Sequence, residues 1–190
     1  MDNDPHQPWT WSRRTLLQTS VAGLAMLGSR ALSPSSAFAG GLPEGRLALF
    51  NVWTDERLDV NYRNEAGQYD LEALDDVNRI FRCHYTGQVA AMDVRVLEYV
   101  NLVQHKLGGG REIHIISGFR SPEYNALLVR SGRRAARNSL HMQGQAVDMR
   151  IPGVHPKVVR QVAVELRRGG VGYYPRSKFV HLDSGPFRIW

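Results

Sequence analysis

In two short runs near the C-terminus, apolar residues alternate with residues that include candidate metal ligands and catalytic groups. These runs are QAVDMRI at 145–151 and KFVHLD at 178–183. Side chains of a strand point alternately to its two faces, so Val147 and Met149 are expected to face a core while Asp148 points away from it. In the second run, His181 points away from the core by the same argument. If the two strands pair, Asp148 and His181 lie on one surface of a sheet whose other face is buried.

A third residue that could bind a metal precedes the first of these strands. His141 stands seven positions before Asp148 in SLHMQGQAVDM, with Gly144 between them. Seven positions is too far for neighbours on one helical face, which are three or four apart, but it suits a loop residue that turns at Gly144 and converges on a strand residue. His141, Asp148 and His181 would be a Zn²⁺-compatible set with a fourth position open, as in catalytic zinc sites. A single histidine is more often a surface or hydrogen-bonded residue, so spacing alone leaves that alternative open.

The remaining patterns predict a single α+β domain with helices packed on a small antiparallel sheet. Alternation predicts an N-terminal hairpin at 46–63, and apolar residues recur at helical spacing in 71–81 and 94–107. A short β-rich run at 112–119 precedes a helix that begins at Pro122 after Ser121 as N-cap and ends before Gly132. Cys83 is the only cysteine, which excludes an intrachain disulfide and a thiolate metal cluster.

The first 39 residues have the pattern of an export signal. Paired arginines, Arg13 and Arg14, precede a modest apolar stretch at 16–27, and AFA stands directly before Gly40. The arginine pair resembles the twin-arginine signal. An uncleaved membrane anchor is the alternative, but the stretch is shorter than the roughly 20 residues that a spanning helix needs. We therefore expect cleavage after Ala39, which leaves one domain at 40–190 with a hairpin at 46–63 and a core at 70–190.

The charge of the mature chain favours anionic partners outside the cytoplasm. The whole chain has a formal net charge of +6, and removal of the leader, whose net charge is +1, leaves +5. An exported basic protein is attracted to the cell wall or to anionic lipid head groups, although the same charge also serves solubility. Nucleic acid is a poor fit to an exported chain. No stable membrane span is expected after cleavage.

Three motifs in the C-terminal half resemble one family of metal enzymes. The pattern SxHxxGxAxD is present at 139–148, SGFRSPEYN stands upstream at 117–125, and GGVGYYPRSKFVHLDSG stands downstream at 169–185. Together they resemble the zinc D-alanyl-D-alanine peptidases, which share a fold with lysostaphin-type endopeptidases and the hedgehog signalling domain, and in particular their exported murein-endopeptidase branch. The resemblance covers about Asp93 to Trp190. It implies one Zn²⁺ per chain, held by His141, Asp148 and His181, and hydrolysis of peptide bonds in peptidoglycan.

Three residues near these ligands also have expected roles, of which only that of Arg120 is implied by the resemblance. In related peptidases the arginine that corresponds to Arg120 contacts the substrate or its oxyanion, although such an arginine can also simply tie two loops together. Ser139 is expected to hydrogen-bond within the ligand loop. The carboxypeptidases of the family carry an acid or histidine just before the last zinc histidine, where this chain has Lys178 and Phe179. Asp183 is then the nearest substitute as the base, or it orients a zinc histidine instead.

The expected function is therefore an exported, zinc-dependent peptidoglycan peptidase, and more narrowly a D,D-endopeptidase that cuts cross-link peptides. A D,D-carboxypeptidase and a non-catalytic, zinc-stabilised wall-binding module are the alternatives, and a third is an exported protein whose His and Asp residues only hydrogen-bond each other. The expected partners are peptidoglycan peptides and the twin-arginine export machinery. We expect a monomer located in the periplasm or otherwise outside the cell membrane, in association with the wall.

Overall fold

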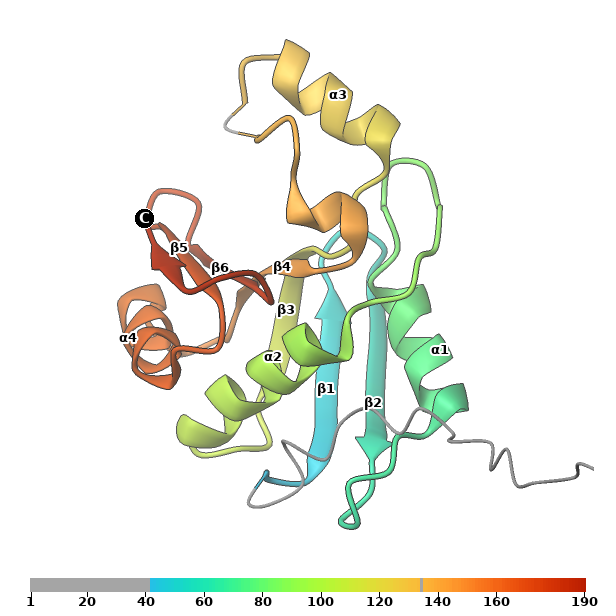
Figure 1. Ribbon diagram of the computed structural model, residues 1–190, viewed down its shortest axis with the longest axis vertical. Helices are drawn as coiled ribbons and strands as arrows, with labels where there is room; N and C mark the ends of the chain where they lie inside the picture. Colours follow the sequence, from blue (N-terminus) through green and yellow to red (C-terminus); the bar gives the residue numbers. More distant parts are fainter. Residues whose placement is uncertain (1–41, 134) are drawn as a thin grey trace, which may run out of the picture. The chain divides into compact units, whose positions relative to one another are not determined.

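The computed structural model describes residues 42–133 and 135–190, so the expected signal peptide lies outside the described residues. Helices and a single sheet make up the described part of the chain (Figure 1). In chain order the elements are β1 (Gly45–Asn51), β2 (Glu56–Arg63), α1 (Leu71–Ile80), α2 (Val94–Lys106), β3 (Glu112–Ser117), α3 (Pro122–Arg130), η2 (Leu140–Gln143), β4 (Ala146–Arg150), α4 (Pro156–Leu166), β5 (Gly170–Tyr174), β6 (Phe179–Asp183) and β7 (Arg188–Ile189).

The sheet is larger than the sequence predicts and it is mixed. Its seven strands lie in the order β2-β1-β3-β4-β6-β5-β7. Strand β1 runs parallel to β3, and β5 runs parallel to β7, whereas the other neighbours are antiparallel. The α+β class is therefore correct, but the small antiparallel sheet is wrong. Parallel neighbours need a long crossover connection, and the chain from β1 to β3 provides one because it includes β2, α1 and α2.

Local signals in the sequence explain where several elements begin and end. The residues of the expected hairpin form β1 and β2, which pair antiparallel across the turn at 52–55. Asp70 accepts hydrogen bonds from two backbone N–H groups in the first turn of α1. Ser121 accepts one from the N–H of Tyr124 at 3.2 Å and so caps α3, while Gly132, with φ +69°, follows the end of that helix. These caps satisfy backbone donors that a helix leaves without partners.

One face of the sheet is buried beneath helices. Helices α2 and α4 contact each other and pack on the sheet, and α1 packs on the hairpin (Figure 1). Alternate strand residues supply the strand side of the core, all almost completely buried: Leu47, Leu49, Ile113, Ile115, Val147, Met149, Val171, Val180 and Leu182. The residues between them in β4 and β6 point to the opposite side of the sheet. None of the described helices has the length and apolar character needed to cross a membrane.

A buried ion pair ties the hairpin to α2. The Nε atom of Arg63 donates to Oε1 of Glu98 at 2.7 Å, and both side chains are only 4% exposed. Arg63 also donates to the carbonyl of Pro43, and the hydroxyl of Tyr69 donates to Glu98. Every charge in this cluster therefore has a partner of opposite sign or a matching hydrogen-bonding group, as buried charges require.

Candidate metal centre

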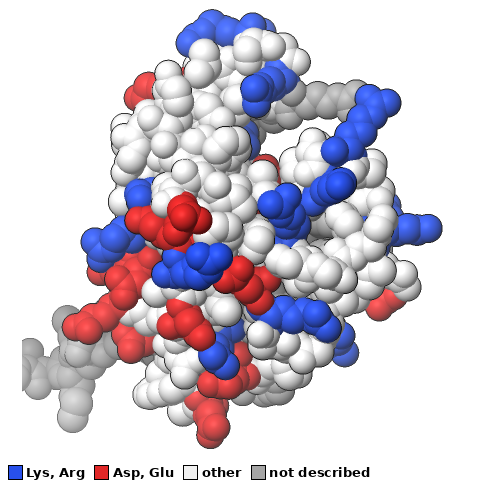
Figure 2. All heavy atoms as spheres, turned by 180° about the vertical axis from the view of Figure 1, so that it is seen from behind, with Lys and Arg blue, Asp and Glu red and all other residues white. Residues whose placement is uncertain are grey.

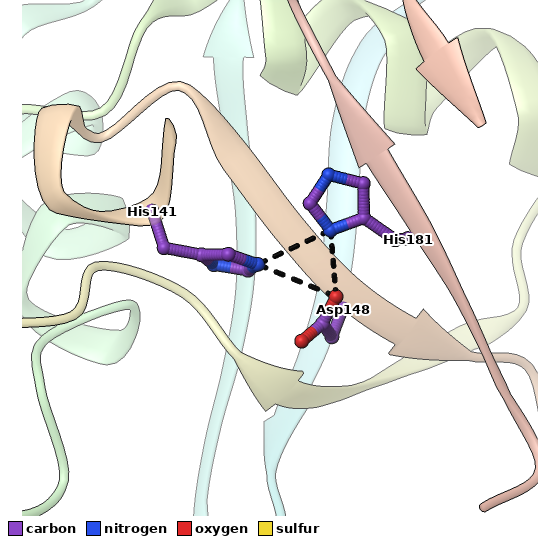
Figure 3. Close-up of side chains that lie close together, drawn as sticks. All are labelled: His141, Asp148 and His181. Atoms are coloured by element: carbon purple, nitrogen blue, oxygen red, sulfur yellow. Dashed lines mark hydrogen bonds and ion pairs between the residues drawn. The ribbon is translucent and has the colours of Figure 1, made fainter. Parts of the chain in front are cut away.

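Three elements bring His141, Asp148 and His181 to one point. Strands β4 and β6 pair antiparallel with Asp148 directly opposite His181, and η2 carries His141 toward them. Gly144 ends η2 with φ +66°, and a side chain at this position would collide with the backbone carbonyl of Ala91. Figure 3 shows the two imidazole rings and the carboxylate pointing toward one another. The structure thus assembles the three side chains that the sequence predicts as ligands.

The spacing of the three inner atoms fits a metal ion. Nε2 of His141 lies 3.2 Å from Nδ1 of His181 and 3.3 Å from Oδ1 of Asp148, and His181 Nδ1 lies 2.8 Å from the same oxygen. These separations are close to those between the corners of a tetrahedron whose bonds to a central zinc are about 2.0–2.2 Å long. All three side chains are buried.

When both rings are neutral, their outer hydrogen bonds leave the inner atoms without a donor. His141 donates from Nδ1 to the carbonyl of Gly118 at 2.8 Å, and His181 donates from Nε2 to the carboxylate of Asp183 at 3.0 Å. A neutral histidine has one N–H and one lone pair, so both rings direct a lone pair toward the oxygen of Asp148. Three acceptors that converge in this way are satisfied together by a cation, and the residues present therefore fit a metal.

The pKa values of the cluster show the same unmet demand for positive charge. Burial lowers the pKa of His141 and keeps that ring neutral. Burial also acts to lower the pKa of His181, but hydrogen bonds to Asp148 and Asp183 outweigh it and raise this pKa to about 9. Burial opposes ionisation of Asp148, yet both histidines hold its pKa far below the usual range. A proton and a metal ion therefore compete for one place.

Asp183 lies behind His181, on the side of the ring away from the converging atoms. Its carboxylate is completely buried and accepts from the backbone N–H groups of Gly170 and Gly185 at 3.1 and 2.9 Å and from Arg188 at 2.7 Å. Burial opposes its ionisation, but His181, the N–H of Gly185 and Arg188 lower its pKa to about 2. A carboxylate held from so many sides fixes the orientation of an imidazole. This geometry favours the orienting role of Asp183 over proton transfer to a substrate.

The inner atoms face a pocket of about 990 Å³ that Arg120 and Ser139 also line. The guanidinium of Arg120 lies 3.7 Å from Oδ2 of Asp148, and it donates to Ser117 and to Asn125 at 3.3 Å each. Its Nε atom is buried and has no hydrogen-bond partner among the described residues. Arg120 thus contacts Asp148 and still has one donor unsatisfied, so both roles considered for it have a structural basis.

Aromatic side chains line the pocket on elements to which the sequence analysis assigned no function. Trp53 is 58% exposed and stacks on His84 with ring centroids 4.6 Å apart, and His84 meets the edge of Tyr124 at 4.9 Å. At the C-terminus, the indole of Trp190 donates to the hydroxyl of Tyr174. All five residues border the pocket. Tyr124 and Tyr174 lie within two of the sequence motifs, and a tryptophan in the turn of the expected hairpin was a further signal that could have indicated this wall.

The other histidines of the described residues lie outside the three-residue cluster. His114 contacts Glu112 at 2.9 Å, and His155 caps α4 by accepting from the N–H of Lys157. His105 lies in the last turn of α2. His84 alone among them reaches the pocket, as part of the aromatic wall.

Comparison with known proteins places the chain in a family. Residues 43–190 match the family model described as "Peptidoglycan L,D-endopeptidase MepK". The chain belongs to this family. It is 36% identical over 181 residues to the "Peptidoglycan L,D-endopeptidase MepK" of Escherichia coli strain K12. The aligned region covers 94% of this chain and 97% of the relative. It is 38% identical over 173 residues to the "Probable peptidoglycan L,D-endopeptidase MepK" of Haemophilus influenzae, with 90% and 92% covered.

Membership in this family makes the chain a metallopeptidase. The metallopeptidase superfamily and its murein-endopeptidase branch, which the three sequence motifs indicate, are confirmed. The name of the family model disfavours the non-catalytic wall-binding alternative, because it describes an endopeptidase.

Proposed function

We propose that this chain is a zinc-dependent endopeptidase that hydrolyses L,D peptide bonds in the cross-links of peptidoglycan. The names of the relatives specify L,D bonds, so L,D takes the place of the D,D specificity expected from the sequence. The observation that carries the proposal is the convergence of His141 Nε2, Asp148 Oδ1 and His181 Nδ1 on one point in the wall of a large pocket.

Each nearby side chain then has a definite task. Zinc held by two histidines and one aspartate supplies Lewis acidity toward a peptide carbonyl and toward water. Asp183 fixes the ring of His181, so that Nδ1 faces the metal position. Arg120 places a positive charge in the pocket beside Asp148, where it can hold a substrate oxygen. Ser139, which precedes η2 and whose side chain makes no capping hydrogen bond, is proposed to hydrogen-bond within the ligand loop.

Metal analysis and product analysis on one preparation test this function. Purified residues 40–190 should contain one zinc per chain, and mass spectrometry of digested peptidoglycan should show products cut at L,D bonds. Stoichiometric zinc without any cleavage would favour a wall-binding module. A protein that binds no zinc would mean that the three side chains form only a hydrogen-bonded cluster.

We propose further that residues 1–39 direct export through the twin-arginine machinery and are removed after Ala39, so that the enzyme acts as a monomer on the wall. The paired arginines and the AFA site support this proposal. Replacement of Arg13 and Arg14 by lysine should leave the protein inside the cell, as judged by fractionation. Normal export of that variant would contradict the twin-arginine assignment.

A further inference from the structure

The charged side chains that line the pocket are mostly positive. Among its described lining residues, the pocket has four arginines, Arg120, Arg133, Arg176 and Arg188, and a single carboxylate, Asp148. Figure 2 shows Lys and Arg side chains bordering the hollow in the upper part of that face, whereas Asp and Glu gather mainly in the lower part. A cleft lined by one sign of charge attracts ligands of the opposite sign. The pocket is therefore suited to an anionic ligand.

Two of the four arginines are already engaged within the protein. Arg188 donates to Asp183, and Arg120 is held beside the metal ligands. Arg133 and Arg176 are different, because both are exposed and neither has an ion pair or side-chain hydrogen bond among the described residues. Two guanidinium groups at the border of the pocket are thus available for a ligand.

The backbone holds both of these arginines at the pocket. Arg133 follows α3, and its N–H donates to the carbonyl of Leu128 at 3.1 Å. Arg176 lies in the turn between β5 and β6, which the N–H of Lys178 closes by donating to Pro175 at 3.3 Å. Two segments distant in sequence therefore present a cation each to the same pocket.

We propose that Arg133 and Arg176 form a basic rim that binds free carboxylates of the substrate peptide beside the scissile bond. The proposal rests on the proposed function and narrows its substrate class to peptides that carry free carboxylates rather than carboxamides. Guanidinium groups pair with carboxylates through charge-assisted and often bidentate hydrogen bonds. A carboxamide has nearly the same shape but no charge, so it loses this interaction.

A matched pair of synthetic cross-linked peptides tests the proposal on the zinc-loaded mature chain. One peptide has free carboxylates next to the scissile L,D bond, and the other has carboxamides there. We expect kcat/KM to favour the carboxylate peptide by about tenfold, and each of Arg133→Gln and Arg176→Gln to reduce that preference by about two- to fivefold, mainly through KM. Cleavage of the carboxamide peptide should change much less in these variants, because a carboxamide offers the guanidinium one neutral acceptor instead of a charged pair, and circular dichroism checks that the variants fold. The preference should shrink as salt is added.

Two control variants separate local binding from the general charge of the protein. Arg137→Gln alters the same loop as Arg133, and Lys178→Gln alters the same turn as Arg176; both residues are exposed and neither lines the pocket. The controls should keep the full preference, and an equal loss in them would overturn the proposal. It would also be overturned if the wild type cleaved both peptides equally, or if the rim variants lost activity to the same extent on both peptides. Cleavage of neither peptide by the wild type would overturn the proposed function itself.

Discussion

Two clusters of charged side chains in this molecule are buried to a similar degree. They differ in whether each hydrogen-bond donor faces an acceptor. In the first, Arg63 meets Glu98, and a carbonyl and a tyrosine hydroxyl complete the set. In the second, His141, Asp148 and His181 are buried to a similar degree. When both rings are neutral, however, their inner atoms are all acceptors, because the outer nitrogens carry the protons.

The difference shows that burial and charge do not by themselves mark a functional site. The Arg63 cluster satisfies itself, so nothing is left for a ligand to supply. The His141 cluster needs a cation and has a pocket through which one can arrive. A mismatch between donors and acceptors, rather than the presence of charge, distinguishes the candidate metal centre from a structural ion pair.

The largest effect is expected when one of the three converging atoms is removed. His141→Ala should lose zinc, and its turnover should fall by more than the about 10–100-fold that loss of an outer partner costs. Metal analysis and peptide turnover measure both quantities, and circular dichroism checks the fold. Zinc retained at full stoichiometry in this variant would mean that the ligand set is wrong.

The matching change in the other cluster should affect stability alone. Glu98→Ala leaves the buried guanidinium of Arg63 without its counter-ion, which should cost about 3–5 kcal/mol in the free energy of unfolding. Denaturant unfolding measures this loss. Zinc content and turnover of the folded variant should equal those of the wild type, and a loss of zinc would show that the two clusters are not independent.

A pair of conservative substitutions compares the two buried arginines. Arg120→Lys keeps the charge but loses the forked geometry, and it should lower kcat by about 10²-fold with little change in stability. Arg63→Lys should lower stability with little change in kcat, because the guanidinium of Arg63 stabilises the fold. Steady-state kinetics and thermal unfolding on both variants provide the comparison. Equal loss of stability in the two would assign Arg120 to bracing the loops.

The smallest expected effect concerns the carboxylate behind His181. Asp183→Asn keeps the shape of the side chain but weakens the orientation of the ring, so zinc affinity should fall by about 10–100-fold. Excess zinc should then restore turnover. If Asp183 served as the base instead, affinity would stay unchanged and turnover would fall by about 10²–10⁴-fold regardless of added zinc. Zinc titration and kinetics on one preparation distinguish these outcomes.

Local sequence was sufficient to predict much of the site. Alternation along 145–151 and 178–183 places the neighbours of Asp148 and His181 in the core and these two side chains on the other face, because strand geometry alone imposes that period. Gly144 marks the turn that brings His141 inward. Ser121 and Pro122 begin a helix without any help from the rest of the fold, because the Ser121 hydroxyl accepts from a free N–H group and Pro122 has no N–H that needs a partner.

Tertiary structure decided what these local patterns could not specify. Alternation determines the face of a strand but not its neighbour or direction, so the parallel pairing of β1 with β3 depended on how the whole sheet and its helices pack. The hydrogen bonding of Asp183 depended on Arg188 and on two backbone N–H groups that fold around it. The carbonyl of Gly118, which sets the tautomer of His141, lies 23 residues away in sequence. Such contacts form only when distant segments are packed together, and no periodicity within one segment encodes them.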